Sequence, residues 1–355
     1  MKSMKSMKKM IRMFAFAAAV CVLFPDAPAD AWRGVLGWTY NAQYPISSSV
    51  AVAGELVLAG DSVGNLHAVY AASGRPAWVY KGTYSVVGRP AAADGRVVFA
   101  QADGTITALS LANGSLLWKH SPSEDALANT VVDGAAIGDG KVFFVRGDGK
   151  MIALSAESGK VLWAYDSGQE LRSAPVFSDG TVFLGEQKGV FSAVNPANGR
   201  RAWGGGAGGP INTPTAEGGD VYFSSWDGSV HRVRIKGVVP QWKAGAGDPV
   251  TTPPLVGKDK VFVGTANGRV AAFSKADGSA RWSFDTQGGT VSGMPAAAEG
   301  LLFVGGGQGT LFVLDAETGV SRFVFQTGGG INGAPAFADG VLFLGSADGN
   351  VYAIL

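Results

Sequence analysis

The chain has 355 residues, of which 46% are apolar and 16% are charged. Its 53 glycines are about twice the usual share and are spread evenly along the sequence. This apolar content excludes an intrinsically disordered protein and indicates a well-packed globular one. Length alone does not fix the number of domains, because all-β proteins of this size often fold as a single domain.

The first 31 residues have the composition of a targeting segment. An apolar run at 14–24 is too short to span a bilayer as a helix. Ala29–Ala31 offers a cleavage site directly before Trp32. Five basic residues precede the apolar run: Lys2, Lys5, Lys8, Lys9 and Arg12. We therefore predict a signal peptide over residues 1–31 and one mature domain over residues 32–355, periplasmic or secreted and without a transmembrane segment.

Cys21, the only cysteine of the chain, lies within this segment. Lipid attachment to Cys21 is disfavoured, because Val20 precedes it where lipoprotein signals have a small residue. Without residues 1–31 the chain keeps 24 basic and 26 acidic residues, a net charge of −2. This balance argues against a nucleic-acid surface. A mature chain without cysteine has no disulfide, no thiolate nucleophile and no cysteine-based metal site.

A repeat of about 40 residues runs through the mature chain. Tryptophans recur with this period, at Trp38, Trp78, Trp118, Trp163, Trp203, Trp242 and Trp282, and Phe323 takes the eighth place. A turn glycine recurs every 39 to 45 residues, at Gly64, Gly104, Gly149, Gly189, Gly228, Gly268, Gly309 and Gly349. No stretch has helical periodicity. The pattern is typical of a β-propeller in which each repeat forms one blade.

Each period predicts four short strands. An apolar run such as Val182–Leu184 is followed by a tight turn, often Asp-Gly as at Asp103–Gly104. The next run, such as Thr105–Leu109, ends in a second turn that leads into the strand with the tryptophan. Prolines cannot donate to a ladder and suit a strand start or a sheet edge, as the innermost strand offers. They precede that strand in six repeats, at Pro90, Pro175, Pro214, Pro254, Pro295 and Pro335.

The two ends of the chain indicate how the ring closes. The last repeat stops at Leu355, before an outer strand, and Gly37–Tyr40 has the composition of the missing strand. We predict that this N-terminal strand completes the last blade, which leaves no open sheet edge. Seven intact repeats and one composite repeat give an all-β, eight-bladed propeller of four-stranded antiparallel blades.

The repeats resemble those of the PQQ-like propeller family, named after the cofactor pyrroloquinoline quinone (PQQ). The resemblance rests on the spacing of alanine, glycine and tryptophan, as in Ala276–Gly278 followed by Trp282. It covers essentially all of residues 32–355 and implies that each tryptophan docks against the neighbouring blade. The fifth repeat departs from the spacing, because Gly237 lies five residues before Trp242 instead of four.

Two branches of this family differ in function. Quinoprotein dehydrogenases bind PQQ and Ca²⁺ at the ring axis, and many hold the cofactor against a vicinal disulfide, which this cysteine-free mature chain lacks. BamB-type subunits of outer-membrane β-barrel assembly are non-enzymatic eight-bladed scaffolds, and the closing run Asp348–Ile354 resembles theirs. The resemblance favours a monomeric protein-binding scaffold without catalytic residues, cofactor or metal, whose partner is a barrel-assembly component. The alternative is a quinoprotein-type redox enzyme or PQQ-binding protein.

Leu171 and Arg172 are the predicted partner-binding residues. Glu170–Pro175 resembles a Leu/Arg loop with which BamB-type subunits engage their barrel partner, although the loop is shorter here. Arg172 is also the only charge three places before the proline column, where the other repeats have Ile46, Val87, Val132, Ile211, Thr251, Ser292 and Asn332. Arginine is favoured at interface hot spots. The alternative is a solvated loop residue near the channel mouth. Replacing both residues with alanine is expected to weaken partner capture and to leave thermal stability intact.

Other candidates have structural explanations. His67 and His231 occupy the same third-strand position in opposite blades, so they are not expected to share a metal ion. Glu124 and Asp125 are adjacent in a polar loop, where solvation is a better explanation than paired-acid catalysis. The fixed outer-strand place of the tryptophans favours packing between blades over sugar binding. A polysaccharide-binding protein remains a third hypothesis, without clustered exposed aromatics outside these packing positions to support it.

Overall fold

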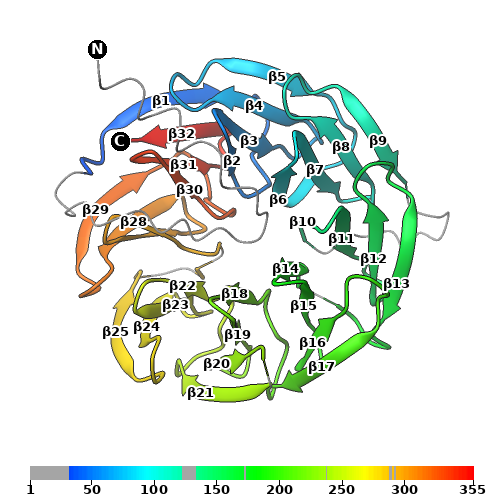
Figure 1. Ribbon diagram of the computed structural model, residues 1–355. Helices are drawn as coiled ribbons and strands as arrows, with labels where there is room; N and C mark the ends of the chain where they lie inside the picture. Colours follow the sequence, from blue (N-terminus) through cyan, green and yellow to red (C-terminus); the bar gives the residue numbers. More distant parts are fainter. Residues whose placement is uncertain (1–31, 122–132, 172, 237, 288–289, 292) are drawn as a thin grey trace, which may run out of the picture.

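A computed structural model describes residues 32–121, 133–171, 173–236, 238–287, 290–291 and 293–355. Its strands form eight four-stranded antiparallel sheets, set as blades around a central axis (Figure 1). The predicted all-β eight-bladed propeller is confirmed. The described residues contain no helix, and hence none long and apolar enough to cross a membrane. The predicted signal peptide at 1–31 lies outside the described residues.

The blades follow one another along the chain, and the strands of each blade run from the innermost to the outermost. The first four blades are blade 1, β2 (Ala51–Ala53), β3 (Leu56–Gly60), β4 (Leu66–Tyr70) and β5 (Pro76–Tyr80); blade 2, β6 (Val86–Ala93), β7 (Arg96–Gln101), β8 (Ile106–Ser110) and β9 (Leu116–His120); blade 3, β10 (Ala136–Gly138), β11 (Lys141–Val145), β12 (Lys150–Ser155) and β13 (Val161–Asp166); and blade 4, β14 (Val176–Ser178), β15 (Thr181–Gly185), β16 (Val190–Val194) and β17 (Arg201–Gly206).

The remaining blades keep this order, and only the last takes a strand from the other end of the chain. They are blade 5, β18 (Thr215–Glu217), β19 (Asp220–Ser224), β20 (Ser229–Arg234) and β21 (Val239–Gly245); blade 6, β22 (Leu255–Val256), β23 (Lys260–Gly264), β24 (Arg269–Ser274) and β25 (Ala280–Asp285); blade 7, β26 (Ala296–Ala298), β27 (Leu301–Gly305), β28 (Thr310–Asp315) and β29 (Ser321–Gln326); and blade 8, β30 (Ala336–Ala338), β31 (Val341–Gly345), β32 (Asn350–Ile354) and β1 (Leu36–Asn41).

Blade 8 closes the ring as predicted. The N-terminal strand β1 pairs antiparallel with the C-terminal strand β32, with Thr39 opposite Tyr352. Beyond the strands, Val35 and Leu355 exchange two backbone hydrogen bonds, of 3.0 and 2.8 Å. The two ends of the described chain therefore meet in one sheet, and β32 is not left as an open edge.

Two kinds of glycine turn occupy opposite faces of the ring. The turn between the first and second strands is seen in blade 2. There Asp94 and Gly95 both have positive φ (49° and 73°), as a type I′ hairpin requires. Between the second and third strands only the glycine does: Gly104 has a φ of 90° and donates its N–H to the Gln101 carbonyl at 2.9 Å. This second geometry fits a type I turn followed by a glycine bulge.

Consecutive strands of a blade run in opposite directions, so the turns between second and third strands share one face with the links from blade to blade. We call this the connection face. It comprises the turns 61–65, 101–105, 146–150, 186–190, 225–229, 265–269, 306–310 and 346–350, together with the described links between each outermost strand and the next innermost strand.

The outer-strand tryptophans join each blade to the next, as the family resemblance implies. The indole Nε1 of Trp38 donates to the Ala71 carbonyl at 2.8 Å. Five more indoles make the same bond: Trp78 to Leu111, Trp118 to Ala156, Trp163 to Pro196, Trp242 to Lys275 and Trp282 to Ala316. Each ring lies against a turn glycine of that next blade, and a Cβ on Gly159 would lie 2.6 Å from the Trp118 ring. The predicted packing role of these tryptophans is confirmed.

Candidate functional site on the connection face

A ring of aliphatic side chains lies beneath the connection face. Each member precedes the innermost strand of its blade, or in blade 2 begins it, and is at most 3% exposed: Ile46, Val86, Leu171, Ile211, Val250, Val291 and Ile331. Several fill a notch left by a glycine at the end of the preceding blade's second strand. A Cβ on Gly185, for example, would lie 2.6 Å from Cγ2 of Ile211. The described members of this ring therefore wedge neighbouring blades against one another.

Leu171 belongs to this ring, and its side chain is fully buried. It forms a β-bridge with Glu186 and packs in one cluster with Val145 of the preceding blade. The expectation that replacing Leu171 leaves stability intact is therefore wrong, because truncating a fully buried leucine opens a cavity. Arg172 lies outside the described residues, so the partner contact at this pair stays a prediction.

The bridges change the correspondence between repeats that the proline column predicts for Arg172. Ile46 and Ile211 bridge the end of the second strand in the same way as Leu171, so they correspond to Leu171 and not to Arg172. In blade 5 the segment between bridge and innermost strand is one residue shorter. In blade 1 the residue that directly precedes the innermost strand is Val50, and no proline marks this position in the sequence.

A buried polar position lies at the end of the second strand in most blades, where it is 0–2% exposed: Asp61, Gln101, Glu186, Ser225, Thr265 and Ser346. In blade 1, Asp61 is hydrogen-bonded to Nε2 of His67 at 3.1 Å, and Nδ1 of His67 lies 3.0 Å from the Tyr40 hydroxyl of blade 8. Burial and the charge of Asp61 raise the pKa of Tyr40. These three groups satisfy one another inside a blade junction, which makes them a structural network.

His231 is held in a similar way in blade 5. Its ring stacks on Phe223 with centroids 4.6 Å apart, and its Nε2 lies 2.8 Å from Oγ of Ser229. Burial and the nearby charge of Lys243 lower the pKa of His231 to about 4. Blades 1 and 5 lie on opposite sides of the ring (Figure 1), so His67 and His231 are far apart, as predicted. Among the described residues, no three His, Cys, Asp or Glu side chains gather as a metal-binding group.

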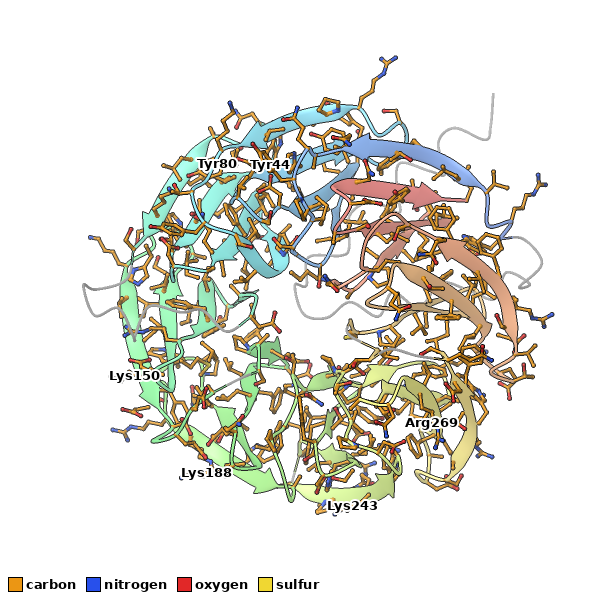
Figure 2. All side chains as sticks on the ribbon, turned by 180° about the vertical axis from the view of Figure 1, so that it is seen from behind. Tyr44, Tyr80, Lys150, Lys188, Lys243 and Arg269 are labelled. Carbon is orange, nitrogen blue, oxygen red and sulfur yellow. The ribbon has the colours of Figure 1, made fainter. Side chains whose placement is uncertain are left out.

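Exposed aromatic side chains lie mainly on the connection face, and the sequence analysis did not predict them. Tyr44 and Tyr84 lie in the links that lead into blades 1 and 2 and are 45% and 52% exposed; Figure 2 labels Tyr44. The turn that carries the exposed Val63 lies between these links, since Ser62 donates its N–H to the Pro45 carbonyl at 2.9 Å and a Cβ on Gly64 would meet the Tyr84 backbone. We call Tyr44, Val63 and Tyr84 the blade 1 cluster.

Trp226 is the counterpart of this cluster across the ring. It lies in the blade 5 turn and is 52% exposed. The backbone N–H of Trp226 donates to the Pro210 carbonyl at 2.9 Å. The link on the other side is bonded to the same turn, because the backbone N–H of Val250 donates to the Ser225 carbonyl. The corresponding turn positions of the other blades hold Ser, Ala, Gly or Gln. A signal was present in the sequence, namely a tryptophan outside the outer-strand register.

The charges of the connection face are mixed. Arg146 and Lys150 both approach Asp148, at 2.9 and 3.6 Å, and Arg269 lies 3.9 Å from Asp248. Figure 2 shows Lys150 and Arg269 on separate blades, with Lys188 and Lys243 between them. The described part of this face is therefore a mosaic of both signs, of the kind that protein partners bind and that nucleic acid does not favour.

The large exposed aliphatic residues follow another pattern. Leu116, Val161 and Val239 are each about half exposed and lie at the first residue of an outermost strand. They are distributed around the rim of the ring, blade by blade. The connection face differs, because its large exposed apolar side chains are mainly aromatic. They lie in the links between blades or in the turns beside those links.

Comparisons with solved structures show the same fold. BamB from Moraxella catarrhalis has a TM-score of 0.78 and 20% identity, covering 90% of this chain and 98% of that chain. The computationally designed Ika8 protein has a TM-score of 0.77 and 19% identity, covering 91% and 99%. A quinohemoprotein alcohol dehydrogenase from Comamonas testosteroni has a TM-score of 0.72 and 14% identity, covering 90% and 76%. At these identities the likeness concerns the fold alone.

The sequence comparison is more specific. No curated protein matches the chain. A family model described as outer membrane protein assembly factor BamB matches residues 29–236, 205–292 and 266–354, which together span nearly the whole propeller. The chain therefore belongs to the PQQ-like repeat family of the outer membrane protein assembly factor BamB.

Proposed function

We propose that this protein is a non-enzymatic periplasmic scaffold that binds a component of outer-membrane barrel assembly through its connection face. The observation that carries this proposal is the set of exposed aromatic side chains there, Tyr44, Tyr84 and Trp226. Tyrosine and tryptophan are enriched among the residues that dominate binding energy at protein interfaces. Membership in the BamB family supports the same assignment.

The placement of these residues suits one partner that covers the channel mouth. The blade 1 cluster and Trp226 lie in opposite blades but on the same face, so a single folded domain can contact both. The mixed charges around them match the polar rim of an ordinary protein interface. The family resemblance adds Arg172, which precedes blade 4 in the sequence, as a further partner contact.

A capture experiment tests this proposal. The mature protein, its Tyr44→Ser/Tyr84→Ser variant and its Trp226→Ala variant are immobilised and exposed to purified barrel-assembly component. Each variant is expected to retain less than about a tenth of the binding, because hot-spot truncations typically cost 2 kcal/mol or more. Tyr70→Ser is the matched control, since Tyr70 is 45% exposed but ends β4 on the opposite face. Equal loss in the control, or full binding by both face variants, would contradict the proposal.

The enzymatic alternative has its own test. PQQ and Ca²⁺ are added to the purified protein, and the absorption spectrum and the reduction of an electron-accepting dye are followed with a panel of alcohols. The scaffold proposal expects neither a spectral change nor dye reduction. Alcohol-dependent dye reduction would overturn the non-enzymatic assignment whatever the outcome of the capture experiment.

A further inference from the structure

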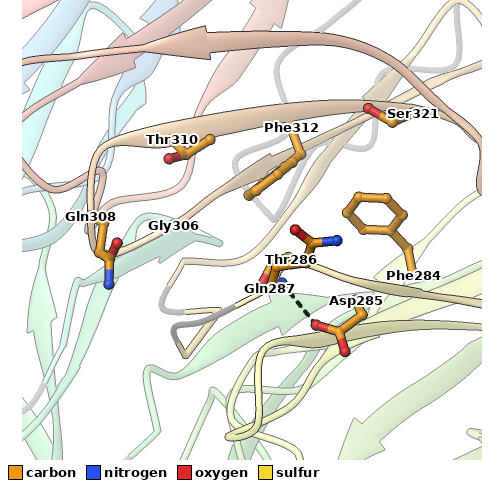
Figure 3. A pocket seen from close by; sticks show the side chains of 10 residues that line it. Phe284, Asp285, Thr286, Gln287, Gly306, Gln308, Thr310, Phe312 and Ser321 are labelled. Atoms are coloured by element: carbon orange, nitrogen blue, oxygen red, sulfur yellow. Dashed lines mark hydrogen bonds between the residues drawn. The ribbon is translucent and has the colours of Figure 1, made fainter.

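Blade 7 interrupts the buried polar column of the connection face. At the end of its second strand Gly306 takes the place that Asp61 holds in blade 1 and Glu186 in blade 4. Those blades fill the space with a carboxylate and its hydrogen-bond partners. Glycine leaves that space empty, and a pocket of about 420 Å³ opens there between blades 6 and 7 (Figure 3).

Two phenylalanines form the apolar wall of this pocket. Phe284 comes from β25 and Phe312 from β28, and their rings meet edge to face with centroids 5.6 Å apart. They occupy the positions that Tyr40 and His67 hold at the junction of blade 8 with blade 1. Both are only partly buried, and Gly306 places no side chain over them. The blade junction thus presents partly exposed aromatic surface beside the space at Gly306.

The rim of the pocket is polar and nearly neutral. It is formed by Asp285, Thr286, Gln287, Gln308, Thr310 and Ser321. The side-chain amides of Gln287 and Gln308 have no hydrogen-bond partner among the described residues, while Oδ1 of Asp285 accepts the Gln287 backbone N–H at 2.8 Å (Figure 3). No Lys, Arg or His belongs to the described lining, so the pocket offers no cation to an anionic ligand.

This combination selects a chemical class of ligand. A purely apolar molecule would displace water from the exposed side-chain amides of Gln287 and Gln308 without offering them a hydrogen bond, which is unfavourable. A saccharide ring presents C–H groups to an aromatic wall and hydroxyls to surrounding amides and a carboxylate. The volume lies within the range of small-molecule sites, about 300–1,000 Å³. We propose that the pocket between blades 6 and 7 binds a neutral saccharide.

This site is separate from the protein interface proposed above. It lies at the junction of blades 6 and 7, whereas the aromatic anchors lie in blades 1 and 5 and in the link into blade 2. It also gives the polysaccharide hypothesis the aromatic surface that the sequence alone did not offer. Phe284 and Phe312 occupy packing positions of the repeat, and they line the pocket together with Gly306, which has no side chain.

The repeat itself supplies fold-compatible variants. Gly306→Gln recreates the residue of blade 2 at this position, where Gln101 is accommodated. A Cβ on Gly306 would approach only the Thr310 carbonyl, at 3.3 Å, and the φ of Gly306 is not positive. Phe312→Ser recreates the residue of blade 4, Ser192, and removes half of the aromatic wall. Both variants are checked for folding by thermal denaturation.

Binding is measured by calorimetry and by saturation-transfer NMR on the mature protein. The probes are maltose, cellobiose, mannobiose and diacetylchitobiose, with glucose 6-phosphate as the anionic comparison. At least one neutral probe is expected to bind with a Kd below about 1 mM. Both variants should weaken that binding at least tenfold, whereas Trp226→Ala should leave it unchanged.

Three results would overturn the inference: no binding of any neutral probe, a preference for the phosphorylated sugar, or undiminished binding by the folded Gly306→Gln or Phe312→Ser protein. If Gly306→Gln fails to fold, Phe312→Ser alone decides. Because Trp226→Ala is expected to lose the protein partner and keep the saccharide, failure of this inference and failure of the scaffold proposal give different patterns.

Discussion

Residues of the connection face differ in their roles, because Leu171 is buried and packs between blades while others are exposed and available for binding. The Leu171 side chain is fully buried against the preceding blade, so Leu171→Ala is expected to lower the free energy of unfolding by about 2–5 kcal/mol. Tyr84→Ala, on the exposed part of the same face, should change it by about 0.5 kcal/mol or less. Urea denaturation measures both values. A Leu171→Ala protein as stable as the parent would show that this leucine is not part of the wedge between blades.

His231 gives the protein a pH dependence that can be assigned to one residue. Burial and Lys243 lower its folded-state pKa to about 4, against the pull of Asp227, while the unfolded value is 6.5. The unfolded chain therefore binds this proton first, and the contribution to stability is fully present above pH 6.5 and is lost as the pH falls towards 4. The loss is about 1–2 kcal/mol, less than the full shift implies, because the ring is partly open to solvent.

The variant His231→Phe tests this assignment. Phenylalanine already occupies the same place in blade 7, as Phe312, so the fold tolerates an aromatic ring there. Denaturation curves at pH 7 and pH 4.5 are expected to differ less for this variant than for the parent. An unchanged pH dependence would assign the effect to other groups, for example the carboxylates of the connection face.

At the scale of the element, the closing strand β1 is the part of the fold with the clearest consequence. It contributes the β32 pairing, the indole bond from Trp38 to Ala71 and the Tyr40–His67 contact. A chain that begins after Asn41 loses all of these and leaves β32 as an open edge, which favours association between copies. We expect a lower Tm and concentration-dependent oligomers in sedimentation experiments.

Strand complementation provides the control for this truncation. A synthetic peptide covering residues 32–44 is expected to restore the Tm and the monomer, because an added strand can satisfy an open sheet edge. The same peptide with Trp38→Ala should restore much less, since the indole docks on the turn of blade 1. Equal rescue by both peptides would show that backbone pairing alone closes the ring.

The elements were predictable from the sequence, and the site was not, for a physical reason. Turn glycines, tryptophans and prolines each act within one repeat or between neighbours, so their spacing alone gave eight blades and the composite closure. The pocket at Gly306 is the space that three side-chain positions from two blades leave unfilled. No single position of the repeat, compared along the sequence, reveals that space. The shorter segment of blade 5 shifted the alignment around Arg172, because counting back from Pro214 assumes a constant length.

At the scale of the whole molecule, the arrangement of the blades allows the chain ends to be moved from blade 8 to another blade. Leu355 and Val35 exchange the same kind of backbone bonds as the two sides of the turn between third and fourth strands; in blade 1, for example, Tyr70 donates to the Arg75 carbonyl at 2.9 Å. Four residues, Ala71–Gly74, connect that pair. A linker of this sequence between Leu355 and Val35 should therefore make blade 8 continuous without strain.

New ends placed between Asp277 and Gly278 then transfer the open junction to blade 6, whose outermost strand β25 would begin the chain. If the ring is held by equivalent contacts at every junction, this circular permutant should fold to the same circular-dichroism spectrum with a Tm within a few degrees of the parent, because adjacent ends and exposed turns tolerate permutation. The indole of Trp242 docks on Gly278 and bonds to Lys275, so fraying of that turn is the main expected cost. A permutant that fails to fold would show that closure depends on contacts particular to blade 8, such as the Tyr40–His67–Asp61 network, and that the eight junctions are not equivalent.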